Sequence, residues 1–148
     1  MDRVVLFLAS GAHVGHVPVA PGTLGSLLAL PLLVGIGYAG LPAWLVVDGI
    51  ALASLGAMPI CARAGRIYGQ VDSPRIVLDE VCGMLIAGAL VPPTVRSLAI
   101  AFAAFRFFDV VKVFPAGYLD RHLKNGIGVV ADDLVAGIYA QLVVRLLT

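Results

Sequence analysis

Residues 17–47 contain no charged side chain, and this stretch decides the environment in which the chain folds. A helix needs about 20 apolar residues to cross the hydrocarbon core of a bilayer, so the stretch can supply one membrane helix and part of a second. The whole chain is similarly apolar, with 60% hydrophobic and 13% charged residues, whereas soluble domains contain about 25% charged residues. We therefore predict an all-α protein embedded in a membrane.

We expect a small polytopic bundle of about four to five membrane-embedded helices. The length of 148 residues and the absence of a composition shift indicate one domain, residues 1–148. Several predicted helices are shorter than the roughly 20 residues of a full crossing, so we expect some of them to be shallow or re-entrant. The predicted helices are residues 26–38 with a kink at Pro31, 43–62, 76–91, 95–114 and 132–147.

The distribution of basic residues predicts how these helices are oriented. If the helices alternate in direction, residues 1–25, 63–75 and 115–131 lie on one side of the membrane. The other side receives only Arg96 and Arg145. The positive-inside rule assigns the crowded side to the cytoplasm. The basic residues on that side are Arg3, Arg63, Arg66, Arg75, Arg106, Lys112, Arg121 and Lys124.

Three short polar segments interrupt the apolar runs, and all lie toward the predicted cytoplasmic side. Ionisable groups against hydrocarbon are costly and mark a functional site by default. Carboxylates suit a hard divalent cation such as Mg²⁺, while an arginine grips phosphate with two parallel hydrogen bonds and a lysine adds a point charge. The pattern predicts metal-assisted phosphate chemistry with an activated water. The predicted catalytic and metal-binding residues are Asp79, Glu80, Asp109, Asp132 and Asp133, and the predicted phosphate-binding cations are Arg106 and Lys112.

Two structural interpretations compete with this one. Arg106, Asp109 and Lys112 recur every three residues, which is also typical of an ion-pair ladder on one helical face. Asp132 or Asp133 could cap the helix that follows, since carboxylates favour helix N-termini. The sequence also indicates how the acidic pairs could meet, because small residues line the helix faces that continue from Glu80 and from Asp133, and small residues allow close helix packing.

Glycine-rich segments precede two of the predicted helices. Residues 20–26 and 125–128 could expose backbone N–H groups to an anion, with Thr23 or Ser26 adding a hydroxyl and Gly128 a backbone donor. Ordinary turns are the alternative for both segments. His13 and His16 are interpreted as loop residues, and Cys61 and Cys82 as reduced thiols in the packed core.

Other classes of function fit less well. The net charge of +1 argues against a nucleic-acid partner, because no basic stripe is present to neutralise phosphates. A small cation channel or carrier would use intramembrane carboxylates along an ion path. Such a path should carry carboxylates at several depths, whereas Asp48 is the only carboxylate placed away from the cytoplasmic end.

Taken together, these segments resemble the bacterial phosphatidylglycerophosphatase A family. The resemblance covers residues 11–140 in four ordered blocks. The blocks are residues 21–26 (PGTLGS), residues 76–80 (IVLDE) with Gly83, residues 105–109 (FRFFD) with Lys112 and Pro115, and residues 126–128 (GIG) with residues 132–137 (DDLVAG).

The resemblance implies a multi-pass enzyme of the bacterial inner membrane whose active site faces the cytoplasm. It implies Mg²⁺-dependent removal of the phosphomonoester from phosphatidylglycerophosphate, a membrane lipid, to give phosphatidylglycerol in phospholipid biosynthesis. A phosphatase of another lipid phosphate is the related alternative. One departure is Val113, where the family usually has proline, and this residue allows the preceding helix to continue.

Overall fold

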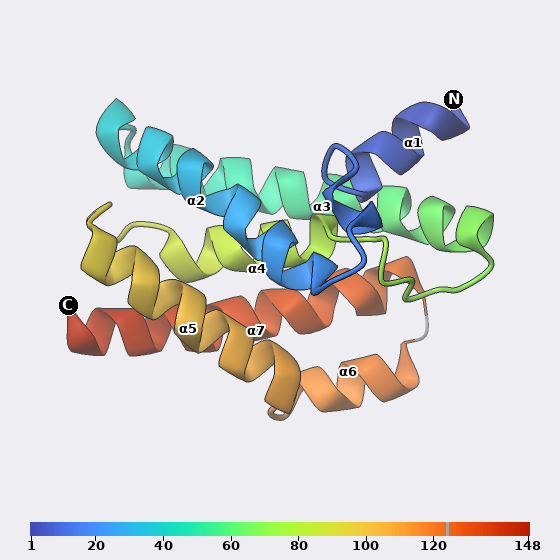
Figure 1. Ribbon diagram of the computed structural model, residues 1–148. Coiled ribbons are helices and arrows are strands. Elements are labelled where there is room, and N and C mark those ends of the chain that lie inside the picture. The colour runs from blue at the N-terminus through green and yellow to red at the C-terminus, as the bar shows by residue number, and fades with distance from the viewer. Residues whose placement is uncertain (124) are drawn as a thin grey trace.

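A computed structural model describes residues 1–123 and 125–148, with side chains for all of these except residues 119–121. Lys124, and the side chain of Arg121, which the sequence places on the cytoplasmic side, lie outside the described residues. The described chain contains helices and no strand, which confirms the all-α prediction (Figure 1). The elements are α1 (Asp2–Ala9), the 3-10 turn η1 (Val14–His16), α2 (Pro21–Ala39), α3 (Ala43–Tyr68), α4 (Leu78–Gly88), α5 (Val95–Val111), α6 (Ala116–His122) and α7 (Gly126–Leu147).

Helix α4 lies at the centre of the bundle. It contacts α2, α3, α5 and α7, while α7 also contacts α3, α5 and α6 (Figure 1). The N-terminal helix α1 is joined to α3 by an exposed ion pair, in which Arg63 Nη2 lies 2.6 Å from Asp2 Oδ1. The hydrogen bond from Arg63, together with its positive charge, lowers the pKa of Asp2.

Among the described residues, three helices are long and apolar enough to cross a membrane, namely α2, α3 and α7, with 19, 26 and 22 residues. Helices α4 and α5 have only 11 and 17 residues. At 1.5 Å per residue, α4 is about 16 Å long, roughly half of the hydrocarbon core. The prediction of a small membrane bundle with some short helices is therefore confirmed, and α4 is the short helix at its centre.

Several predicted boundaries are wrong because local signals start or end the helices elsewhere. Helix α2 begins at Pro21, within the predicted glycine-rich loop, since proline suits the first turn of a helix. Helix α5 ends at Val111 although proline is absent from position 113, because Lys112 takes a left-handed conformation with φ 48°. The predicted loops 1–25 and 115–131 contain α1 and α6.

Glycines allow the backbones of α4 and α7 to contact each other directly. A Cβ added at Gly83 would lie 2.6 Å from the carbonyl oxygen of Asp133, and a Cβ at Gly137 would overlap the carbonyl oxygen of Gly83. The predicted packing of two small-residue faces is thus present. Both cysteines are free and buried, as expected.

Candidate active site

The α4–α7 contact brings three carboxylates together. Asp79 and Glu80 lie in the first turn of α4, and Asp133 lies about two turns after the start of α7. Each offers one oxygen within 4.8 Å of the other two. Asp79 and Asp133 are buried, and Glu80 is half-buried. Like charges at this separation repel strongly when water is excluded, so the cluster requires a proton or a cation.

Glu80 supplies the observation that favours a cation. Its Oε2 atom is buried and has no hydrogen-bond partner among the described residues. A buried charged oxygen without a partner is costly, and a bound metal ion would remove that cost. All three donors are carboxylate oxygens, which Mg²⁺ and Ca²⁺ prefer over nitrogen and sulfur ligands. The residues therefore fit a hard divalent cation.

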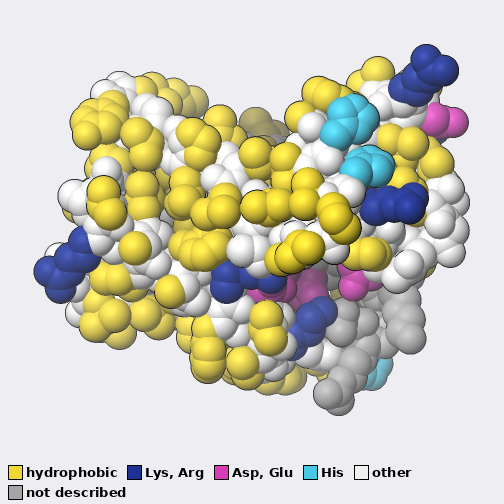
Figure 2. Space-filling view, viewed as in Figure 1, with side chains coloured by type: hydrophobic (Ala, Val, Ile, Leu, Met, Phe, Trp, Pro, Cys, Tyr) yellow, Lys and Arg dark blue, Asp and Glu magenta, His cyan; other side chains and the backbone are white. Residues whose placement is uncertain are grey.

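The cluster forms part of a cavity of about 110 Å³. All five carboxylates predicted from the sequence line it, so the α4, α5 and α7 segments do converge. Figure 2 shows acidic side chains gathered in a hollow on an otherwise largely apolar face, with basic side chains beside them. The lining residues are Asp72, Asp79, Glu80, Asp109, Lys112, Val129, Asp132 and Asp133.

Each predicted phosphate-binding cation is paired with a carboxylate. Arg106 Nη1 lies 2.6 Å from Asp109 Oδ2 on the same helix, and Lys112 Nζ lies 2.9 Å from Asp132 Oδ2 on α7. The ladder interpretation explains only the first pair. Because Lys112 lies beyond the end of α5, it leaves that helical face and joins α5 to α7.

The capping interpretation of Asp132 and Asp133 is wrong. Helix α7 begins at Gly126, and its N-cap is Asn125. The Asn125 Oδ1 atom accepts hydrogen bonds from the N–H groups of Ile127 and Gly128, both at 3.0 Å. The two acidic residues therefore lie inside the helix, where a cap has no role. The second of these bonds already occupies the Gly128 N–H group, which was predicted as a phosphate donor. Gly128 also does not line the acidic cavity.

The start of α2 borders the same site from the opposite side. A Cβ added at Gly22 would overlap Glu80 Oε1 and would lie 3.6 Å from Arg106 Nη1. Only glycine therefore allows α2 to come this close. The Ser26 hydroxyl donates to the carbonyl oxygen of Gly22 at 2.9 Å and accepts from Arg106 Nη1 at 3.5 Å.

The first hydrogen bond of α2 runs from the N–H of Leu24 to the carbonyl oxygen of Ala20, at 3.2 Å. The N–H groups of Gly22 and Thr23 precede it and belong to the positive end of the helix dipole, which favours anions. They are uncharged donors at the start of α2, and Gly22 lies beside Arg106.

Sequence reasoning missed Asp72. This residue lies in the loop between α3 and α4 and is exposed, yet it lines the acidic cavity. The Gln70 side chain donates to the carbonyl oxygen of Asp72 at 2.9 Å. The only available signal was its position shortly before Asp79, because an acid in a polar loop is otherwise unremarkable. His16 lies at the surface, with its Nε2 atom 3.5 Å from the Tyr68 hydroxyl oxygen, and does not line the acidic cavity. Asp48 is exposed on α3.

The chain matches the profile of the family described as Phosphatidylglycerophosphatase A over residues 7–148. The protein belongs to the phosphatidylglycerophosphatase A family. It is 38% identical to phosphatidylglycerophosphatase A of Haemophilus influenzae over 139 residues, covering 93% of this chain and 84% of the relative. It is 33% identical to the Escherichia coli protein of the same name over 132 residues, covering 88% of this chain and 76% of the relative.

A third relative carries a different name. A Bacteroides thetaiotaomicron protein, provisionally named a phosphatidylinositol-3-phosphatase, is 31% identical over 146 residues, covering 94% of this chain and 90% of the relative. No solved structure matches this member of the phosphatidylglycerophosphatase A family. The shared element of these names is lipid phosphate hydrolysis, so the protein is a phosphatase.

Proposed function

We propose that the protein hydrolyses the phosphomonoester of phosphatidylglycerophosphate in a Mg²⁺-dependent reaction, releasing phosphatidylglycerol and phosphate. The observation that carries the proposal is the meeting of Asp79, Glu80 and Asp133 within 4.8 Å, beside Arg106 and Lys112. Carboxylates alone would suit many cation sites, whereas adjoining basic groups suit a substrate that carries phosphate. Two family relatives are named for this substrate.

Asp79, Glu80 and Asp133 are the residues that would hold the metal ion. A bound Mg²⁺ would polarise a phosphoryl oxygen and lower the pKa of a water molecule. The unpartnered Oε2 atom of Glu80 gives this carboxylate a free ligand position. The cavity, about 110 Å³, has room for a phosphate group and a few waters.

The remaining side chains bind and orient the phosphate. Arg106 offers its guanidinium N–H groups to the phosphoryl oxygens, while Asp109 and Ser26 hold that guanidinium in place. Lys112 lines the cavity and is held by Asp132, so it can supply a second positive charge. The positive charges stabilise the negative charge that moves to the leaving glycerol oxygen as the P–O bond breaks.

The start of α2 completes the phosphate site. Gly22 lies beside Arg106, and in this proposal the N–H groups of Gly22 and Thr23 and the Thr23 hydroxyl donate to the phosphate. A carboxylate that lines the cavity accepts the proton of the attacking water. That proton is then available for the leaving glycerol oxygen.

The membrane fixes how the substrate arrives. The acyl chains remain in the bilayer, and only the headgroup needs the polar cavity. We assign the cavity to the cytoplasmic side of the bacterial inner membrane, because the same end of the bundle carries most of the basic residues.

Phosphate release by the purified protein in detergent micelles tests this proposal. Phosphatidylglycerophosphate should be hydrolysed with Mg²⁺, and EDTA should abolish turnover until Mg²⁺ is added again. Asp79→Asn and Asp133→Asn should each reduce turnover by at least about 100-fold, because an uncharged amide is a poor ligand for the metal and a metal site contributes several kcal/mol. Asp48→Asn is the matched control, since Asp48 is an exposed carboxylate on α3, outside the cavity lining. Full activity in EDTA, or in Asp133→Asn, would contradict the proposal.

A 3-phosphorylated inositol lipid is a second candidate substrate, favoured by the name of the Bacteroides relative. Two relatives are named for the glycerol lipid and one for the inositol lipid, which favours the glycerol lipid. Comparing kcat/KM for the two lipids in the same micelles distinguishes them. We expect the glycerol lipid to have the higher value by at least about tenfold, which corresponds to about 1.4 kcal/mol.

A further inference from the structure

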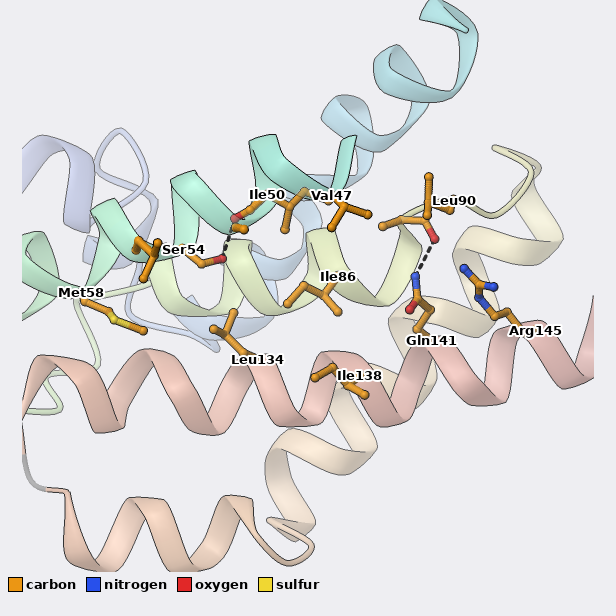
Figure 3. Close-up of a pocket in the computed structure, with 13 residues that line it drawn as sticks. Val47, Ile50, Ser54, Met58, Ile86, Leu90, Leu134, Ile138, Gln141 and Arg145 are labelled. Atoms are coloured by element: carbon orange, nitrogen blue, oxygen red, sulfur yellow. Dashed lines mark hydrogen bonds between the residues drawn. The ribbon is translucent and has the colours of Figure 1, made fainter. Parts of the chain in front are cut away.

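A second and larger cavity lies between α3, α4 and α7 and shares no lining residue with the acidic cavity. Its volume is about 610 Å³, within the usual range of about 300–1,000 Å³ for ligand pockets. Its wall is almost entirely aliphatic, with Val47, Ile86 and Ile138 projecting into it (Figure 3). Val47 and Ile138 are also exposed, so the cavity opens toward the surrounding bilayer. Hydrocarbon is therefore the medium that fills it.

Polar groups are confined mainly to one end of this cavity. Gln141 and Arg145 lie there, on successive turns of α7 (Figure 3). The Gln141 amide donates to the carbonyl oxygen of Ala89 at 2.7 Å, which fixes the end of α4. The next residue, Leu90, is held with φ 57°, a conformation that is unfavourable for a bulky residue. The groups that form this end are therefore held in a defined arrangement.

Arg145 gives that end a positive charge. It lies in the last turn of α7 and is exposed, with its guanidinium extending toward the end of α4 (Figure 3). No carboxylate in the described part of the chain lies within ion-pair distance of it. An apolar cavity with a cation at one end complements a molecule with a hydrocarbon chain and an anionic head.

The length of the cavity matches one leaflet of a bilayer. Leu134 and Arg145 line it eleven residues apart on α7, a distance of about 16 Å at 1.5 Å per residue. The hydrocarbon core is about 30 Å thick, so one leaflet accounts for about 15 Å. Because Arg145 is in the last turn of a helix long enough to span the membrane, it lies at the interface opposite the acidic cavity, and the apolar cavity extends from it into the hydrocarbon core.

We propose that this cavity binds a phospholipid of the leaflet at the C-terminal end of α7, with one acyl chain in the cavity and its phosphate on Arg145. Basic groups between membrane helices attract the anionic headgroups of lipids, and Arg145 supplies such a charge here. The site goes beyond the proposed function, because Arg145 is twelve residues from Asp133 along α7, or about 18 Å. The bound lipid is therefore not the substrate.

Native mass spectrometry of the detergent-purified protein with added dioleoyl phosphatidylserine, an anionic lipid, tests the proposal. This probe carries a phosphate but has no phosphomonoester to hydrolyse. The wild-type protein should retain one lipid. Ala51→Phe should weaken retention at least tenfold because Ala51 lines the cavity. Ala53→Phe, two residues away on the same helix and exposed but outside the lining, should not.

The headgroup contact is tested separately. Arg145→Gln should also weaken retention at least tenfold, whereas Arg96→Gln should not, although Arg96 is an exposed arginine that donates to Leu147 at the same end of the bundle. Asp133→Asn should retain the lipid, which separates this site from the catalytic proposal. Thermal unfolding without lipid identifies any variant that misfolds, and Ala51→Leu is the milder filling substitution in that case. Equal retention by the Ala51 and Ala53 variants, or by Arg145→Gln and wild type, would overturn the proposal.

Discussion

Replacing Gly83 with alanine should separate the two halves of the carboxylate cluster. Gly83 lies where α4 crosses α7, and a Cβ there would meet Phe105 Cε2 at 2.5 Å and the carbonyl oxygen of Asp133 at 2.6 Å. Comfortable contacts lie near 3.5 Å, so α4 must move away from α7 by roughly 1 Å. The oxygen belongs to the helix backbone and cannot rotate away.

Both stability and catalysis should suffer from this shift. Overpacking of this kind costs about 1–3 kcal/mol, and a 1 Å displacement of a catalytic group can reduce the rate by about 100-fold. We expect Gly83→Ala to unfold at a lower temperature and to release phosphate from phosphatidylglycerophosphate about 100-fold more slowly. Raising the Mg²⁺ concentration should recover part of the activity if the displaced carboxylates bind the ion more weakly.

Gly56→Ala is the matched control. Gly56 also lies inside a helix, but a Cβ there has nothing within 4 Å. Alanine should leave activity unchanged and stabilise the helix by about 0.5–1 kcal/mol. Wild-type activity and stability in Gly83→Ala would refute the close α4–α7 approach on which the site depends. Equal damage from both substitutions would point to a general intolerance of alanine in these helices.

Three further predictions concern the phosphate site, a helix cap and the topology. Arg106→Lys keeps the positive charge but loses the planar guanidinium, so phosphate release should fall at least tenfold while thermal unfolding stays unchanged. Normal turnover in this variant would remove Arg106 from the phosphate site. Asn125→Ala should cost about 1 kcal/mol because it removes the N-cap of α7, and Asn125→Ser should recover most of this in thermal unfolding; no loss in the alanine variant would contradict the cap. A cysteine introduced at exposed Leu123 should react with a membrane-impermeant maleimide only from the cytoplasmic side, and one at Pro92 only from the opposite side. The background should be low because both native cysteines are buried. Labelling of both positions from one side would refute the orientation.

Much of the fold could be predicted because hydrophobicity acts over whole segments. The uncharged stretch that contains α2 predicts a membrane helix independently of its neighbours, because charged side chains are costly in hydrocarbon. The five candidate carboxylates were predictable for the same reason, because each interrupts an apolar run at a cost that packing alone does not repay. The small residues that follow Glu80 and Asp133 also indicated which helix faces would meet.

Helix ends were less predictable, because short-range hydrogen bonds compete there. Asp132 is as good a cap by residue type as Asn125, and only the folded chain shows that Asn125 accepts the bonds at the start of α7. Lys112 likewise has no sequence signal for the left-handed conformation that ends α5 and turns its side chain toward Asp132.

The sequence by itself therefore determined the class of fold, the membrane environment and the acidic and basic residues of the candidate site, because these follow from the cost of charge in hydrocarbon. Only the tertiary structure decided which helices pair, that Asp72 joins the acidic cavity, and that a cavity ending at Arg145 opens between α3, α4 and α7. An aliphatic side chain has the same composition whether it contacts lipid, another helix or an open cavity. The difference arises only from how the helices pack.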